Sequence, residues 1–261
     1  MGVERLKGMF ASLEGERAAL IAYATGYYPD RKRCENVIVT MLDSGADAIE
    51  IGIPFSDPVM DGPVIQETSR QALNAGATPD GILEMVASLR RYTDRPILAM
   101  TYYNIVHRYR PGPFARDAVS AGLDGLVVPD LPAEEMGQFK DACDAAGLAT
   151  VAFCSGTTSP ERIALASGMT TGFLYCISLL GTTGERDSLD PGLPGFMQAV
   201  RENADVPLAV GLGISTPEQC AGAGRIANGV IVGSSFMSSV ARGKGDLSAL
   251  SSLVSSMALA L

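Results

Sequence analysis

Short apolar runs alternate with amphipathic stretches along the whole chain of 261 residues. The apolar runs are four to eight residues long and rich in branched side chains, which is typical of buried strands. In the stretches between them, apolar residues recur three and four positions apart, as on one face of a helix. The pattern predicts eight strands, each followed by a helix: residues 19–25, 46–53, 96–103, 123–128, 148–153, 172–177, 207–211 and 229–232.

This alternation predicts the fold class. Eight strand–helix units at an average spacing near 33 residues are typical of a (β/α)8 TIM barrel, a member of the α/β class. Before the first strand, Leu6, Met9, Phe10 and Leu13 have the spacing of an extra N-terminal helix. No linker or charge run divides the chain, so we expect residues 1–261 to form a single domain.

Charge and cysteine content exclude several classes of protein. The net charge is -9 and no run of Lys and Arg forms a basic footprint, so we expect no nucleic-acid partner. The start of the chain lacks the apolar block of a signal peptide, and no apolar segment is long enough to cross a membrane. The five cysteines show no pairing pattern: Cys34, Cys143, Cys154, Cys176 and Cys220. We therefore expect them to be reduced thiols in a cytoplasmic protein, and we expect no metal site.

An acidic residue stands in the middle of the second strand. Glu50 lies between Ile49 and Ile51, and strand alternation places it on the face opposite the isoleucines. A carboxylate inside an apolar strand requires a partner, a raised pKa or a function. A structural ion pair with an arginine is one explanation. The other is catalysis, because Asp61 follows in a loop that can return over the strand end, and two carboxylates in one pocket suit acid–base chemistry.

Glycines gather after the last three strands. In barrels, backbone N–H groups at these exits commonly bind phosphate without a lysine. A single Gly-x-Gly can equally be a turn that requires positive φ, but three such exits together favour a phosphate site. The phosphate donors that we expect are Gly184, Gly213, Gly233 and Ser234.

These residues give the chain a resemblance to a known family. Residues 49–62, read as an acid between aliphatics, Gly-Ile-Pro-Phe-Ser-Asp-Pro and Asp-Gly, are similar to the signature of tryptophan synthase alpha subunits. Residues 124–132, 175–184 and 211–215 match further segments of that family. The resemblance implies a lyase that cleaves indole-3-glycerol phosphate into indole and glyceraldehyde 3-phosphate. It implies that Glu50 and Asp61 are the catalytic pair and that Tyr175 lines the site.

The resemblance also assigns roles to positions outside the catalytic pair. Tyr102 and Thr183 would contact the substrate, whereas Asp57 and Pro54 would face a partner subunit. A turn-stabilising aspartate is the alternative for Asp57. His107, the only histidine, receives no role. Departures from the family pattern include Leu179, where some members carry arginine, Met60 beside Asp61, and a first loop reading Gly26-Tyr27. The glycine-rich start of residues 179–190 predicts a lid.

The implied partner is a tryptophan synthase beta subunit in an alpha2beta2 heterotetramer. Pyridoxal phosphate would belong to that beta subunit, with no cofactor in this chain. Two alternatives stay open, namely a stand-alone lyase that releases free indole and a catalytically inactive barrel that serves only as an interface. A Schiff-base aldolase is disfavoured because it needs a lysine on a buried strand. The four lysines fall in helices or loops: Lys7, Lys32, Lys140 and Lys244.

Overall fold

A single parallel sheet forms the centre of the computed structural model, which describes residues 2–177, 191–211 and 213–261. The strands within these ranges follow the order β5-β4-β3-β2-β1-β9-β8-β7-β6 across the sheet. Their bounds are β1 (Ala19–Thr25), β2 (Ala48–Gly52), β3 (Ile97–Met100), β4 (Gly125–Val127), β5 (Ala149–Val151), β6 (Phe153–Ser155), β7 (Leu174–Ile177), β8 (Leu208–Gly211) and β9 (Gly229–Val232).

The strand predicted at 148–153 is divided in two, and this division closes the barrel. β5 pairs with β4, and β6 pairs with β7. Between them, the N–H of Ala152 donates to the Thr170 hydroxyl at 3.1 Å, while the carbonyl of Ala152 accepts from Tyr175 at 2.9 Å. The two ends of the sheet therefore meet in one stretch of chain. Counted this way, the eight predicted strands are confirmed, and the predicted (β/α)8 barrel is correct.

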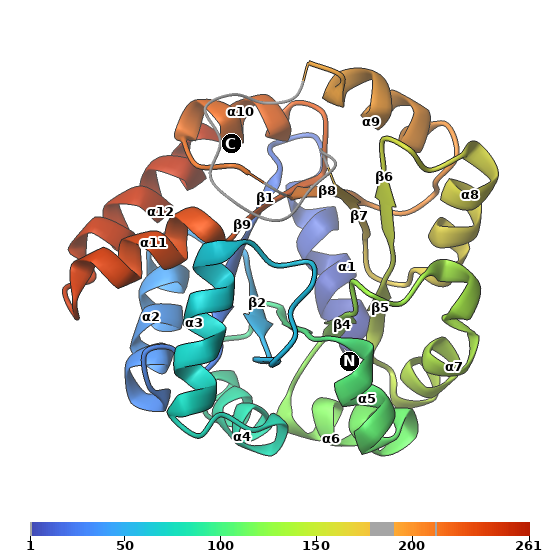
Figure 1. Cartoon of the computed structure of the whole chain (residues 1–261). Coiled ribbons are helices and arrows are strands. Elements are labelled where there is room, and N and C mark those ends of the chain that lie inside the picture. The colour runs from blue at the N-terminus through green and yellow to red at the C-terminus, as the bar shows by residue number, and fades with distance from the viewer. Residues whose placement is uncertain (1, 178–190, 212) are drawn as a thin grey trace.

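Helices surround this barrel (Figure 1). Thr78 and Thr216 cap two of them, each accepting from a backbone N–H of the first turn, as the Thr-Pro pairs at these positions predict. The helices are α1 (Gly2–Leu13), α2 (Arg31–Asp43), α3 (Pro63–Asn74), α4 (Pro79–Arg90), α5 (Tyr103–Tyr109), α6 (Pro111–Ala121), η1 (Ala133–Glu135), α7 (Gly137–Ala146), α8 (Pro160–Met169), α9 (Leu193–Arg201), α10 (Pro217–Gly224), α11 (Ser234–Gly243) and α12 (Ser248–Ala260).

Three helical details differ from the pattern-based expectation. α5 begins at Tyr103, inside the strand predicted over 96–103, and its seven residues form about two turns, too few to show helical periodicity in the sequence. The helix that follows the fourth predicted strand begins as the 3₁₀ turn η1 before α7. The last helix is a pair, α11 and α12, separated by Lys244 in the left-handed region at φ 48°.

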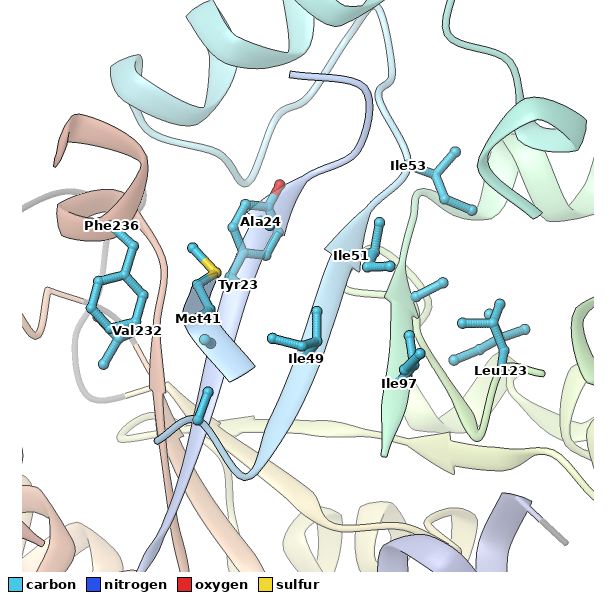
Figure 2. Packing of buried hydrophobic residues seen from close by; sticks show 14 of the residues in the cluster. Tyr23, Ala24, Met41, Ile49, Ile51, Ile53, Ile97, Leu123, Val232 and Phe236 are labelled. Atoms are coloured by element: carbon cyan, nitrogen blue, oxygen red, sulfur yellow. The ribbon is translucent and has the colours of Figure 1, made fainter. Parts of the chain in front are cut away.

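Two hydrophobic layers reflect the alternation along each strand. Ile49 and Ile51 point outward from β2 into the layer between the barrel and its helices (Figure 2). Ala48, on the opposite face, belongs to the interior layer. There α1 lies across the amino-terminal end of the barrel, visible at the centre of Figure 1, and packs Leu6 and Phe10 against strand residues. The barrel is thus closed at one end, which leaves its other end for a site.

Candidate active site

Glu50 lies at the centre of β2 and faces the barrel interior, as alternation predicts. Its side chain is fully buried, and among the residues that the structure describes neither carboxylate oxygen has a hydrogen-bond partner. The alternative explanation, an ion pair with an arginine, is therefore wrong for Glu50. β2 ends two residues later because Pro54 cannot donate to the next strand. An unpaired buried acid disfavours folding and needs another reason for its presence.

The surroundings of Glu50 determine its protonation. Burial is the main cause that raises its pKa, from 4.5 to about 8, and the nearby charge of Asp61 raises it further. The carboxyl group therefore holds its proton at neutral pH and is still able to release it. A group with this pKa can serve as both acid and base within one catalytic cycle.

The loop after β2 brings Asp61 to the same cavity. Two hydrogen bonds fix the backbone of Asp61. Its N–H donates to the carbonyl of Pro58 at 3.1 Å, and its carbonyl accepts from the side-chain amide of Gln66 at 2.8 Å. Burial raises the pKa of Asp61 from 3.8 to about 6, and a hydrogen bond from Tyr102 opposes that rise. Asp61 is thus an anion at neutral pH while Glu50 is neutral, which is the division of roles expected of an acid–base pair.

Tyr102 holds this loop in place. Its hydroxyl oxygen accepts from the N–H of Met60 at 3.0 Å, and its ring stacks on Phe55 at a centroid distance of 5.2 Å. The same hydroxyl hydrogen-bonds the Asp61 carboxylate, and burial beside that charge raises the pKa of Tyr102. Tyr102 therefore orients Asp61. Whether it also contacts substrate stays a prediction.

Tyr175 enters the cavity from the opposite wall. On β7 it stacks on Phe153 with ring centroids 4.7 Å apart, and its phenol oxygen lies over Gly211 of β8. A Cβ at Gly211 would lie 2.4 Å from that oxygen, so only glycine leaves room for the ring. Burial and the charge of Glu50 raise the pKa of Tyr175, which keeps the phenol protonated.

The third wall is made of backbone. Gly213 follows β8 with φ 79°, and Gly233 follows β9 as the residue before α11. The N-cap residue of α11 is Gly233, which has no side chain to cap the helix, and the first N–H groups of a helix, here from Ser234 onward, have no partner within the helix and can bind an anion. All three residues line the cavity that also contains Glu50 and Asp61. The cavity has an empty volume of about 490 Å³, solvent space at its mouth included.

Some expected positions are not part of this arrangement. Thr183 and Gly184, with the lid expected over 179–190, lie outside the described residues. Asp57 is exposed and accepts from the Ser56 hydroxyl at 2.5 Å, whereas Pro54 is buried at the end of β2. Their assignment to a partner interface stays a prediction. His107 is exposed on α5, away from the cavity lining.

Pattern-based reasoning missed several residues that line the cavity. Tyr23 is the polar one, and the others are Ile65, Met100, Ile214 and Ile231. Tyr23 shares the interior-facing parity of β1, which is a signal that the sequence contains. The apolar composition of residues 19–25 hid it, because each residue there is buried and nothing marks one face as special.

All five cysteines are free and buried. Burial raises the pKa of Cys34, Cys143 and Cys220 to about 12, so these thiols stay protonated and unreactive. No helix in the described ranges is long and apolar enough to cross a bilayer.

Known proteins share both the sequence and the fold. Residues 10–258 match the family model described as tryptophan synthase alpha chain. The tryptophan synthase alpha chain of Deinococcus radiodurans is 41% identical, with 95% of this chain and 92% of that protein covered. The Geotalea daltonii protein of the same name is also 41% identical, with 89% of each covered.

Solved structures agree. A chain of Mycobacterium tuberculosis tryptophan synthase superposes with a TM-score of 0.92 at 35% identity, covering 98% of this chain and 97% of that one. The tryptophan synthase alpha subunit of Legionella pneumophila gives a TM-score of 0.91 at 33% identity, with the same coverage of both chains. By this family model and by these relatives in sequence and structure, the chain belongs to the tryptophan synthase alpha chain family.

Proposed function

We propose that this protein cleaves indole-3-glycerol phosphate into indole and glyceraldehyde 3-phosphate, as the alpha subunit of tryptophan synthase in L-tryptophan biosynthesis. One observation carries the proposal: a buried Glu50, without a hydrogen-bond partner among the described residues and with a pKa of about 8, shares a cavity with Asp61 and with the backbone of Gly213 and Gly233. Membership of the family supports the same reaction.

The chemistry follows from the two protonation states. Neutral Glu50 gives its proton to C3 of the indole ring, and Asp61 stabilises the positive charge that forms at the ring N–H. The bond between C3 and the glycerol carbon then breaks, and its electron pair neutralises the ring. The ionised Glu50 takes the proton of the adjacent glycerol hydroxyl, which becomes the aldehyde. Glu50 is thereby protonated again, so the residue returns to its initial state.

The orientation of the substrate depends on the wall that is made of backbone. Gly213, Gly233 and Ser234, with Gly184, hold the phosphate, which places the other end of the substrate against β2 and β3. Tyr175, Tyr102 and Thr183 contact the substrate between these ends. Fixing a phosphate at one wall converts its binding energy into alignment of the bond to be broken.

The partner of this chain is the beta subunit of tryptophan synthase, in an alpha2beta2 assembly. Asp57 and Pro54 belong to the loop that faces it, and the exposed Val59 beside them supports this placement because 70% of its surface is accessible. No step of the proposed reaction uses a cofactor in this chain, and pyridoxal phosphate acts on the beta subunit. Residues 1–261 work as a single domain in the cytoplasm.

The decisive experiment compares Glu50→Gln with the wild-type chain. Glutamine keeps the shape of the side chain but cannot shuttle a proton. We expect turnover of indole-3-glycerol phosphate to fall by about a hundredfold or more, while affinity for glycerol phosphate is unchanged. Glu67→Gln, an exposed change on α3, is the matched control and retains full turnover. Near-normal lyase activity of Glu50→Gln would overturn the assignment.

The same assay separates the alternatives when indole is measured with and without beta subunit. Stimulation by the beta subunit supports the synthase role. Strong activity alone, without stimulation, would identify a stand-alone lyase. Absent turnover with intact partner binding would identify an inactive interface barrel.

A further inference from the structure

Tyr23 has no part in the acid–base pair, yet the strand register places it between the two ends of the site. β1 lies between β2 and β9 in the sheet. On one side Tyr23 is the register partner of Glu50. On the other side Ala22 pairs with Val232, so Tyr23 stands level with Gly233, the next residue along. A molecule that reaches from Glu50 to the phosphate glycines must cross Tyr23.

Two glycines make room for this tyrosine. A Cβ at Gly52 would lie 2.1 Å from the Tyr23 hydroxyl oxygen, and a Cβ at Gly233 would lie 3.3 Å from its ring. The ring thus fits against backbone on both sides, and its hydroxyl points toward the carboxyl ends of the strands (Figure 2). Tyr23 lines the cavity together with Glu50, Asp61 and Gly233. A phenylalanine would fill the same space, so packing alone does not account for the hydroxyl.

The hydroxyl is also chemically suited to a polar ligand. Burial, and then the charge of Asp61, raise the pKa of Tyr23, so the phenol keeps its proton. The side chain of Thr25 hydrogen-bonds it, and Thr25 in turn lies 2.7 Å from the Thr68 hydroxyl. This chain of hydroxyls fixes the phenol without occupying its full capacity, because a phenol both donates and accepts.

We propose that Tyr23 is a specificity-determining residue that hydrogen-bonds the hydroxyl groups of the glycerol chain as that chain passes from Glu50 to Gly233. The inference rests on the proposed substrate, whose indole and phosphate ends are joined by a three-carbon chain with two hydroxyls. Besides its hydrogen bond with Thr25, the phenol lines the cavity and can exchange a further hydrogen bond with a ligand, so it favours a ligand that offers a hydroxyl over one that does not.

Tyr23→Phe removes only the hydroxyl and tests the assignment directly. Binding is measured in the Glu50→Gln background, where substrate is not consumed, with two ligands: indole-3-glycerol phosphate and indole-3-propanol phosphate, which lacks both chain hydroxyls. We expect Tyr23→Phe to weaken binding of the first about fivefold to tenfold and to change the second by less than about twofold. In the otherwise wild-type chain, kcat/KM should fall by a similar factor.

Tyr92→Phe is the matched control, because Tyr92 is exposed, lies outside the cavity lining and donates its hydroxyl hydrogen to Asp43. It should leave affinity for both ligands unchanged. Equal weakening of both ligands by Tyr23→Phe, or no weakening of either, would overturn the role of Tyr23 alone. If the chain with intact Tyr23 bound neither ligand, the proposed substrate itself would be wrong and this inference would be wrong with it.

Discussion

Glu50→Gln should make the protein more stable at alkaline pH while it abolishes turnover. The wild-type carboxyl has a pKa near 4.5 in the unfolded chain and about 8 when buried. A carboxyl group whose pKa is higher in the folded chain takes up a proton on folding, so the free energy of unfolding falls as pH rises between these two values. Glutamine does not ionise, so Glu50→Gln should not show this decrease in the free energy of unfolding.

The magnitude follows from the same two values. A rise in pKa from 4.5 to about 8, at ~1.4 kcal/mol per pH unit, corresponds to at most about 5 kcal/mol. At about pH 5 both side chains are neutral, so we expect the two proteins to differ by less than ~1 kcal/mol. Above about pH 8 the variant should be the more stable by several kcal/mol.

Urea denaturation at intervals between about pH 5 and 9 measures this difference. Asp61 is present in both proteins, so its own titration largely cancels in the comparison. Glu67→Gln is the control, because the Arg70 and Gln71 side chains lower the pKa of Glu67 to about 2 and it stays ionised throughout. Its effect on stability should not change over this range. Parallel pH profiles for the wild-type chain and Glu50→Gln would refute the assignment of a buried, unpaired carboxyl.

Two further outcomes follow from the contacts around the acids. Tyr102→Phe removes the hydrogen bond that lowers the pKa of Asp61, so the acid limb of the pH–rate profile should move to a pH above about 6. An unchanged acid limb would show that Tyr102 does not act on Asp61. Gly52→Ala places a Cβ 2.1 Å from the Tyr23 hydroxyl oxygen. We expect urea denaturation to show a free energy of unfolding lower by ~1–3 kcal/mol, and turnover assays to show a lower kcat/KM. Gly8→Ala, where no atom lies within 4 Å of the added Cβ, should change neither; equal effects of the two changes would contradict the steric argument.

Local pattern was sufficient to predict the strands and the direction of Glu50. Apolar runs ended by proline or glycine mark where a strand must stop, and alternation gives each side chain its face. Pro54 and the isoleucines of β2 are enough for that deduction. The division at Ala152 was out of reach, because it depends on the Thr170 hydroxyl, which reaches Ala152 only in the folded barrel.

Some residues of the candidate site could likewise be predicted from the sequence, and others could not. Glu50 was recognisable because an acid in an apolar strand is conspicuous, and Asp61 because it follows at a turn. Tyr23 was not recognisable, since a tyrosine in a buried strand is ordinary until the register places it beside Glu50. Burial raises the pKa of Asp61 to about 6, although the residue lies in a loop. Burial of a loop residue depends on contacts such as Tyr102 that no local pattern contains.

The closed amino-terminal end of the barrel affects how substrate enters the site and how product leaves it. α1 packs Phe10 against Phe173, and Phe173 adjoins Tyr175 at a centroid distance of 6.3 Å, so aromatic rings fill the interior from α1 up to the cavity. In the described part of the chain, substrate entry and product exit therefore use one opening. A protein that receives the indole must seat itself over that opening, and while seated there it also controls when the next substrate can enter.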